Sequence, residues 1–543
     1  MITVSPVMRK GAKIALVGEA PTIRDIESKV MFSLQVGRVL DKALSFANID
    51  RKQCSVTMVS KEPTNFNDLY HYSGKDRLRL PKLNQWLTML KAELGSGAVN
   101  VAVALGEEAL YALTDKRGIT KWRGSILPST LVPGLKVIPA LSPSWIMRGQ
   151  FQHFWNLVTD LTRAEKQSHF KAIVPPKYQS FTSPDLGAVK RFIACIGSEE
   201  KWSLDIETRA HQLACFSIAY QDRAMCIPIQ NPNGPAYFPG HEAIIWQEVR
   251  RLMERNPYLV GQNLTFDLEY LFDYGLEPSG IWMDTMISHA VLYPEFPKGL
   301  DFLAAMYTEM PYYKADGKVS NPNLTTQDLW TYNNKDTIAT LWSALEIEKQ
   351  LNKRGLWSVH EFVTKELGLA LEMQRNRLKI DPAKKAELKV LMGQAGQELS
   401  GKWAAKHNNT LERLAGDPVI VRPNVNSPKQ VAEFLYKTLK LPVKTRDGAV
   451  VSDETAISEL KAANPEIEEL GWILEERHLR KLNSSYLDVA TEPDGTWAGS
   501  WCVHGTETGR WSSGKGARGR GLNLQTVPKA VRWMIVPPER QAA

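Results

Sequence analysis

The segment Trp202-Ser203-Leu204-Asp205-Ile206-Glu207-Thr208 places two acidic residues two positions apart within an apolar run. Successive side chains of a β-strand point to opposite faces, so Asp205 and Glu207 are expected to share one face. Two adjacent carboxylates repel each other unless a cation lies between them, and hard divalent cations take oxygen ligands. The pattern by itself also fits a solvated strand face, because acidic pairs are frequent in a chain with 59 aspartate and glutamate residues.

Two later segments contribute further acidic residues. The first, residues 259–267, ends in Asp267, and the second is Tyr332-Asn333-Asn334-Lys335-Asp336, which leads into an expected helix. Tyr332 and Asp336 are four positions apart, so on a helix they lie on one face. Four carboxylates and a phenol suit two-metal hydrolysis of a phosphodiester, in which the tyrosine hydroxyl can orient the attacking water.

In this order, the three segments resemble the DEDD exonucleases that carry a tyrosine in the third motif. More narrowly, they resemble the 3′–5′ proofreading domain of family A DNA polymerases, the DNA polymerase I group, of phage type. The resemblance implies a ribonuclease H-like domain that holds two Mg²⁺ or Mn²⁺ ions and acts on single-stranded DNA 3′ ends. It implies that Asn263 and Phe266 contact the frayed end. The implied metal ligands are Asp205, Glu207, Asp267 and Asp336, with Tyr332 positioning the water.

The composition is that of an ordinary soluble globular protein, and the expected fold class is α/β multidomain. A length of 543 residues exceeds what one hydrophobic core supports, and the net charge of +8 suits a polyanionic partner. Five cysteines without a C-x-x-C spacing argue against a zinc ribbon, an iron–sulfur cluster or a disulfide framework. They fit a reducing cytoplasm, which would be the host cytoplasm for a phage protein. No signal peptide is expected, because the N-terminus lacks a long apolar core after a basic start. No membrane span is expected, because no apolar run reaches about 18 residues.

The first part of the chain, up to about residue 175, alternates apolar runs with helical patterns. This alternation predicts a parallel α/β sheet with ligands at the strand ends. The expected strands are residues 13–21, 54–59, 99–105 and 135–140, and the expected helices are residues 36–46 and 107–113.

Four short motifs in this part resemble the uracil-DNA glycosylase superfamily: residues 18–21, 105–110, 119–124 and 141–144. Active members hold a carbonyl oxygen of the flipped base with a histidine, and Ser142 stands in that place here. A hydroxyl cannot become cationic, and losing such a donor costs about 10²–10³ in rate. An active glycosylase, a DNA-binding or uracil-sensing remnant and a structural domain all stay open. Lys121-Trp122-Arg123 fits a DNA backbone contact or a surface hairpin.

Three domains are expected along the chain. Residues 163–182 resemble a linker, and Ser183 is expected to cap a helix over residues 185–196. Asp284 is expected to cap another helix. The predicted domains are residues 1–175 (glycosylase-like), 176–355 (exonuclease) and 356–543 (a partial polymerase domain, mainly helical thumb with the start of a palm).

The last part is predicted to be mainly helical, and its order resembles the thumb and early palm of family A polymerases. The resemblance implies that Arg477 and Lys481 lie along the duplex, although both also fit a solvated helix face. Arg510 lies in a Thr-Gly-Arg motif that implies contact with the primer minor groove, where acceptor atoms occupy similar places in every base pair. Further implied DNA contacts are Thr508, Asn523 and Gln525. The expected helices are residues 366–376, 382 onward, 430–439, 453–463 and 466–486, with a short strand at 377–381.

The sequence ends at Ala543, before the motifs that carry nucleotide addition in that family. We therefore expect a fragment or subunit of a DNA polymerase with proofreading activity, bound to single-stranded 3′ ends and primer–template duplex. A truncated product and one half of a split polymerase, completed by a second chain, are both open. The alternatives are a non-catalytic DNA-binding subunit of such a split enzyme and a uracil-DNA glycosylase.

Overall fold

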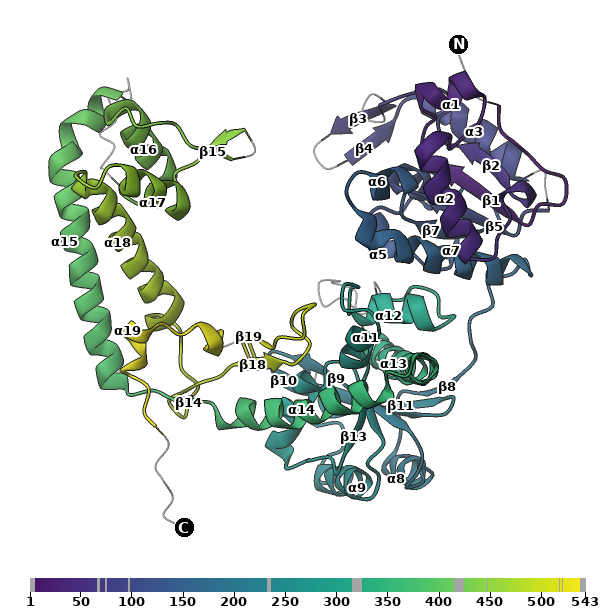
Figure 1. Ribbon diagram of the computed structural model, residues 1–543. Coiled ribbons are helices and arrows are strands. Elements are labelled where there is room, and N and C mark those ends of the chain that lie inside the picture. Colours follow the sequence, from purple (N-terminus) through teal and green to yellow (C-terminus); the bar gives the residue numbers. More distant parts are fainter. Residues whose placement is uncertain are drawn as a thin grey trace. The chain divides into compact units, whose positions relative to one another are not determined.

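The computed structural model describes residues 5–65, 69–73, 76–95, 98–231, 236–314, 325–414, 424–446, 448–516, 518–519 and 521–537. The chain divides into two compact units, Met1–Lys365 and Glu366–Ala543. The first unit holds two separate sheets, and the second is built mainly from helices (Figure 1). The α/β multidomain class predicted from the sequence is confirmed.

The first sheet has the strand order β2-β1-β5-β7-β6, with the first four strands parallel and β6 antiparallel at the edge. Both faces of the sheet are buried, as a parallel sheet requires: Ile14 and Leu16 face one hydrophobic cluster, and Ala15 and Val17 face the other. The four predicted strands and two predicted helices are all present. The strands are β1 (Ile14–Gly18), β2 (Ser55–Met58), β5 (Val101–Leu105), β6 (Leu127–Pro128) and β7 (Lys136–Ala140), with the hairpin β3 (Tyr70–Ser73) and β4 (Asp76–Arg79) outside the sheet.

Helices cover both faces of this sheet. Leu40 of α2 and Leu157 of α7 pack on one face, and Leu87 of α3 and Leu110 of α4 pack on the other. The helical segments are α1 (Ile23–Ser28), α2 (Leu34–Phe46), η1 (Arg51–Gln53), α3 (Pro81–Gly95), α4 (Glu107–Thr114), α5 (Ile119–Trp122), α6 (Pro143–Met147), η3 (Phe151–His153) and α7 (Phe154–Ser168).

The second sheet has the order β13-β12-β9-β10-β11-β8. Its centre is the antiparallel set β9 to β11, and β12 runs parallel to β9. The strands are β8 (Gln179–Phe181), β9 (Trp202–Arg209), β10 (Gln212–Tyr220), β11 (Arg223–Pro228), β12 (Leu259–Gly261) and β13 (Ile281–Asp284). The helical segments are α8 (Leu186–Ala194), α9 (Glu242–Arg255), α10 (Leu264–Leu271), η4 (Phe272–Tyr274), α11 (Thr285–Leu292), α12 (Leu300–Tyr307) and α13 (Thr326–Arg354).

The two faces of this sheet carry different side chains. Phe216 of β10 stacks on Trp246 of α9, so its face is the apolar one. The next residue, Ser217, faces the opposite side and donates to Asn334 of α13. On β9, Ser203 likewise donates to a carbonyl of α13. Because strand side chains alternate, Asp205 and Glu207 lie on the same face as Ser203, and α13 covers that face (Figure 1).

Local signals set the ends of two helices in this domain. Thr325 and Asp328 form a capping box at the start of α13, and Gly355, with a φ of 67°, ends it. The cap of α8 is Asp185, whose side chain accepts from the N–H of Ala188. The predicted cap, Ser183, is therefore wrong by two residues, because the carboxylate of Asp185 reaches the free N–H groups of the first turn.

In the second unit, the long helices α15 and α18 pack along each other. One hydrophobic cluster forms around Trp403 and Phe434, and another around Trp497 and Met534. All five predicted helices occur, although α14 begins nine residues earlier than expected. The elements are α14 (Trp357–Asn376), β14 (Leu378–Lys379), α15 (Pro382–Leu414), α16 (Pro428–Glu433), η5 (Phe434–Thr438), β15 (Thr445–Arg446), β16 (Ala449–Val450), α17 (Glu454–Ala463), α18 (Glu468–Leu482), η6 (Asn483–Leu487), β17 (Thr496–Trp497), β18 (Ser500–Cys502), β19 (Ser512–Gly514), η7 (Leu524–Thr526) and α19 (Lys529–Arg532).

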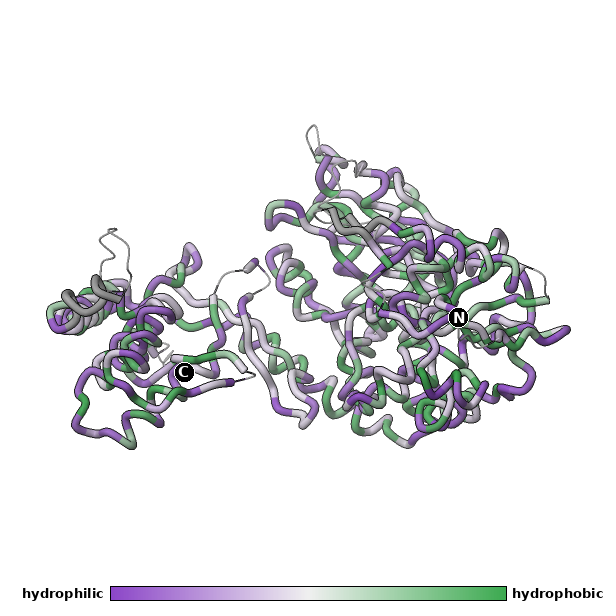
Figure 2. The backbone as a smooth tube through the Cα atoms, turned by 90° about the horizontal axis from the view of Figure 1, so that it is seen from above, coloured by the Kyte–Doolittle hydropathy of each residue, from purple (hydrophilic) through white to green (hydrophobic). Residues whose placement is uncertain are grey.

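Hydrophobic and hydrophilic residues alternate at short intervals along the backbone (Figure 2). Among the described residues, none of the helices combines the length and apolar character that crossing a bilayer requires.

Candidate active site

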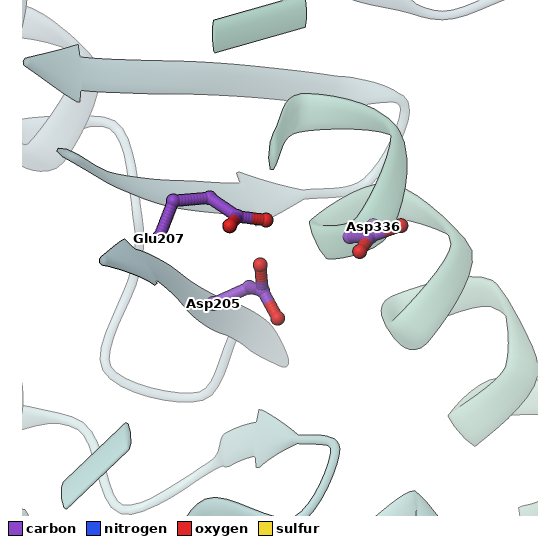
Figure 3. Close-up of side chains that lie close together, drawn as sticks. All are labelled: Asp205, Glu207 and Asp336. Carbon is purple, nitrogen blue, oxygen red and sulfur yellow. The ribbon is translucent and has the colours of Figure 1, made fainter. Parts of the chain in front are cut away.

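Three carboxylates converge where α13 crosses β9. Asp205 and Glu207 project from the strand and Asp336 from the helix (Figure 3), and one oxygen of each lies within 4.8 Å of the others. Asp336 is only 5% exposed, and its Oδ1 has no hydrogen-bond partner among the described residues. A buried oxygen without a donor, within an all-oxygen ligand set, fits a hard divalent cation.

The fourth predicted carboxylate, Asp267, lies beside this group. It belongs to α10, is 4% exposed, and accepts a hydrogen bond of 3.0 Å from the N–H of Ile206 on β9. Burial raises the pKa of Asp267 to about 8, and the Ile206 N–H opposes the rise. The structure thus brings Asp267 against β9 at Ile206, the residue between Asp205 and Glu207.

The electrostatics of the group favour a cation. Burial raises the pKa of Asp205 well above its usual value, and the charges of Asp336, Asp267 and Glu207 raise it further. Burial, followed by the charge of Asp336, raises the pKa of Glu207 to about 8. Carboxylates that repel each other in a buried space are stabilised in their charged form when a cation enters.

Tyr332 lies one helical turn before Asp336, as its spacing predicts. Its half-buried hydroxyl accepts a hydrogen bond of 3.0 Å from Lys314. Burial and the charge of Asp336 raise the tyrosine pKa, so the phenol keeps its proton at neutral pH. Tyr332 can therefore donate a hydrogen bond to a water or phosphate oxygen.

The amide of Asn333, which sequence reasoning did not select, contacts the carboxylate group. The fully buried Asn333 donates from Nδ2 to Asp205 Oδ2 at 2.6 Å. Its Oδ1 lies 3.8 Å and 3.7 Å from the thiols of Cys215 and Cys226, which act as weak donors. The only sequence signal for Asn333 is its place between Tyr332 and Asp336 in the third segment.

A lysine completes the group. Lys314 donates to Asp336 Oδ2 at 2.6 Å and to the Tyr332 hydroxyl. No motif in the sequence pointed to Lys314, because it lies 22 positions before Asp336 in a segment without periodicity.

The second segment forms a tight strand-to-helix turn. Asn263 has a φ of 61°, a left-handed conformation that asparagine tolerates, and directly precedes α10. Asp284 accepts from the N–H groups of Asn263 and Leu264 and also caps α11, so the predicted cap is confirmed. Phe266 is half-buried, with its ring 5.4 Å from that of Tyr270. The aromatic ring is therefore partly open to solvent, one residue before Asp267.

Three stretches of the chain match known protein families. Residues 6–162 match the uracil DNA glycosylase superfamily, residues 185–354 match a 3′-5′ exonuclease family, and residues 392–542 match DNA polymerase family A. Each of the three models covers less than a third of the chain, and the last of them makes residues 392–542 similar to family A DNA polymerases. The exonuclease match covers all the carboxylates described above.

Individual proteins similar to this chain include DNA polymerases. The chain is 28% identical to DNA polymerase I of Borreliella burgdorferi over 53% of this chain and 30% of that protein. It is 22% identical to the DNA polymerase of Bacillus phage SP01 over 96% of this chain and 63% of that protein. Among solved structures, the POL domain of Pol1 from M. smegmatis, in complex with DNA primer-template and dNTP, matches at a TM-score of 0.48 and 18% identity. That match covers 66% of this chain and 59% of that one. The chain thus spans less than two thirds of the length of these relatives.

In the family A segment, the two basic residues selected on α18 differ in environment. Arg477 is half-buried and donates to the carbonyl of Ser452 at 2.6 Å, and burial lowers its pKa. Lys481 is exposed. Arg477 therefore has a structural contact within the second unit, whereas the ammonium group of Lys481 faces solvent.

The other residues selected in this segment lie in a turn, for Thr508 and Arg510, and at the short helix η7, for Asn523 and Gln525. Thr508 and Arg510 are exposed, and the Arg510 N–H donates to the Thr506 hydroxyl, which closes the turn. The Asn523 side chain accepts from the N–H of Gln525. Gln525 in turn donates to the Trp511 carbonyl at 3.2 Å. Asn523 and Gln525 thus stabilise the local backbone, and the Arg510 side chain is presented to solvent.

Ser142 lines a cavity at the strand ends of the glycosylase-like sheet. The cavity of about 190 Å³ is also lined by Glu19, Phe32 and Met58. Burial raises the pKa of Glu19, which accepts from the N–H of Glu108. The strand-end position predicted for a ligand site in this sheet is therefore hollow.

The segment Lys121-Trp122-Arg123 corrects a sequence-based expectation. Trp122 ends the short helix α5 and is buried, and Arg123 is buried against Asp160. A buried ring and a buried ion pair can neither line a DNA backbone nor form a surface hairpin. Both interpretations of these two residues are wrong, because they pack against the rest of the first unit instead.

Proposed function

We propose that this chain is a 3′–5′ exonuclease that removes nucleotides from single-stranded DNA 3′ ends with two Mg²⁺ or Mn²⁺ ions, as the proofreading part of a DNA polymerase. The observation that carries the proposal is the convergence of Asp205, Glu207 and Asp336 within 4.8 Å. The match of residues 185–354 to a 3′-5′ exonuclease family supports it. On this proposal, Asp205, Glu207, Asp267 and Asp336 are the metal ligands.

The side chains suit an attack of water on the terminal phosphodiester. When bound, the metal ions supply positive charge to the phosphate and lower the pKa of the attacking water. The protonated Tyr332 hydroxyl orients that water through a hydrogen bond. Asn333 holds the Asp205 carboxylate in one orientation through its hydrogen bond to Oδ2. On this proposal, Asn263 and Phe266, at the turn before Asp267, contact the unpaired 3′ nucleotide.

Single carboxylate substitutions test this proposal. The Asp205→Ala and Asp205→Asn variants are expected to lose at least about a hundredfold in rate, because one charged group of the transition-state environment is lost. The rate is measured on a 5′-labelled single-stranded oligonucleotide with Mg²⁺ or Mn²⁺. Asp222→Asn, at an exposed turn of the same sheet, is the matched control and is expected to trim at the normal rate. Unchanged trimming by both Asp205 variants would refute the proposed site.

We further propose that the second unit binds primer–template duplex. The match of residues 392–542 to DNA polymerase family A and the exposed side chains of Lys481, Thr508 and Arg510 support this. Asn523 and Gln525 contribute by holding the backbone at η7 through their hydrogen bonds. Nucleotide addition would belong to this unit together with the remaining length of the relatives, of which the chain spans only a part.

The alternatives have less support. A non-catalytic subunit would not need four carboxylates gathered beside one strand. Excision of uracil would use the cavity of the glycosylase-like sheet, and Ser142, which takes the histidine's place there, cannot supply a cationic donor. We therefore assign the cavity no catalytic role in the proposal.

A further inference from the structure

Lys314 forms an ion pair with Asp336, one of the proposed metal ligands. Its Nζ lies 2.6 Å from Asp336 Oδ2 and 3.0 Å from the Tyr332 hydroxyl. The lysine side chain is 19% exposed and the aspartate side chain 6%, so the ion pair is largely shielded from water. An ammonium group paired to one member of the carboxylate cluster reduces the repulsion among the others. It also repels any second cation that approaches the same oxygen atoms.

The segment that carries Lys314 is attached to the glycosylase-like domain. The ring of Tyr312 packs 4.2 Å, centroid to centroid, from that of Trp122, and Lys121 Nζ lies 5.2 Å from the Tyr312 ring centre. The next residue, Tyr313, is buried, with its ring 6.1 Å from that of Tyr332. The two residues directly before Lys314, Tyr312 and Tyr313, are therefore both held by aromatic contacts.

The same domain also holds the end of α12, which leads into this segment. The buried Arg163 guanidinium of α7 donates to the carbonyls of Ala305 and Thr308. Gln167 of α7 donates to the Glu309 carboxylate at 2.7 Å. Residues 305–312 thus rest on the glycosylase-like domain, and Lys314 follows two residues later.

We propose that Lys314 is a tethered counter-cation of the carboxylate cluster, which competes with a divalent metal ion for Asp336, and that the glycosylase-like domain holds it in place through Tyr312. The inference rests on the proposed metal site. It gives the first domain a role in the exonuclease site that needs no uracil. Lys314 is a positioning residue here: it holds the Tyr332 hydroxyl and sets how tightly the cluster takes up metal.

The test measures Mn²⁺ binding to the full chain without DNA, by the electron paramagnetic resonance signal of free Mn²⁺. The Lys314→Met and Lys314→Gln variants are expected to bind the ion about five- to tenfold more tightly, because metal no longer displaces a shielded ion pair. The Asp205→Asn variant lacks one proposed ligand, so a loss of Mn²⁺ binding in this variant identifies the carboxylate cluster as the binding site. Lys201→Met, which breaks the Lys201–Glu348 ion pair elsewhere in the same domain, is the matched control and should leave the affinity unchanged.

The Lys314 variants are expected to bind Mn²⁺ more tightly and yet to trim DNA more slowly. At saturating Mn²⁺, both Lys314 variants are expected to trim DNA more slowly, because the Tyr332 hydroxyl loses its partner, while the half-saturating metal concentration falls. A purely structural lysine would not tighten metal binding when removed. Mn²⁺ affinity that is unchanged or weaker in both folded variants would overturn the proposal.

The role of the first domain is tested with Tyr312→Ala. This variant removes the ring contact with Trp122 and is expected to tighten Mn²⁺ binding by less than Lys314→Met. Combined with Lys314→Met it should add nothing, because both act through one group. Full additivity, or no effect of Tyr312→Ala, would overturn the coupling to the glycosylase-like domain. Because these measurements contain no DNA, a chain that binds Mn²⁺ as expected but trims no DNA would count only against the proposed exonuclease.

Discussion

Asn333 offers a sharp test of how the cluster is held, because its neighbour Asn334 is a matched control. Both are fully buried residues of α13. Asn333 donates to the Asp205 carboxylate at 2.6 Å. Asn334 instead bonds away from the cluster: it donates to Ser180 Oγ and the Phe181 carbonyl and accepts from Ser217. Replacing each with alanine therefore separates loss of orientation at Asp205 from loss of buried hydrogen bonds in general.

The magnitude follows from the bond that is lost. A hydrogen bond to a charged group contributes about 1.5–3 kcal/mol. If that energy orients Asp205 in the transition state, Asn333→Ala is expected to slow trimming by about 10- to 150-fold, at about 1.4 kcal/mol per factor of ten. Asn334→Ala loses three hydrogen bonds and is expected to lower stability at least as much, with a rate within about threefold of the parent chain.

The assay is single-turnover trimming of a 5′-labelled oligonucleotide at saturating Mn²⁺, with thermal unfolding of each variant measured alongside. A normal rate in folded Asn333→Ala would show that the amide does not orient Asp205. Equal rate losses in the two variants would show that trimming follows the stability of α13 rather than the contact with Asp205.

Two further predictions concern pH and DNA. The pKa of Glu207 and of Asp267 is raised to about 8 from 4.5 and 3.8, so the folded chain retains protons that the unfolded chain has released. Between about pH 4 and 8, the thermal stability of the metal-free chain should therefore fall as pH rises. In the Glu207→Gln variant this fall should be shallower, and equal pH dependence in the variant and the parent chain would contradict the raised pKa of Glu207. Arg510→Ala should weaken binding of primer–template duplex about tenfold in a fluorescence anisotropy titration, because an exposed cationic contact is lost. The control Arg251→Ala, on α9, should leave the affinity unchanged, and equal affinities for all three chains would remove Arg510 from the interface.

Local rules accounted for most of the predicted elements. The strands β1, β2, β5 and β7 were visible because a strand buried on both faces is a continuous apolar run. Where two signals competed within a few residues, the prediction failed: Asp185 rather than Ser183 caps α8, since the carboxylate is the one that reaches a free N–H. The predicted start of α14, at residue 366, lies after its observed start at Trp357.

Side chains whose role depends on a distant partner were predicted least well. Trp122 and Arg123 are an aromatic and a cation in a short polar stretch, and nothing near them shows that they are buried. Arg123 pairs with Asp160, which is 37 positions away. The contact between Trp122 and Tyr312 joins two stretches that match different families, and such a contact leaves no periodic pattern in either segment.

The sequence by itself determined which carboxylates share a surface. Asp205 and Glu207 lie on one face because a strand alternates, and Tyr332 and Asp336 lie one turn apart because a helix repeats every 3.6 residues. Only the tertiary structure decided that these two surfaces meet, that Asn333 reaches Asp205 across 128 positions, and that Lys314 pairs with Asp336. Backbone periodicity acts over a few residues, whereas the packing of α13 on the sheet depends on the shapes of all the side chains between them.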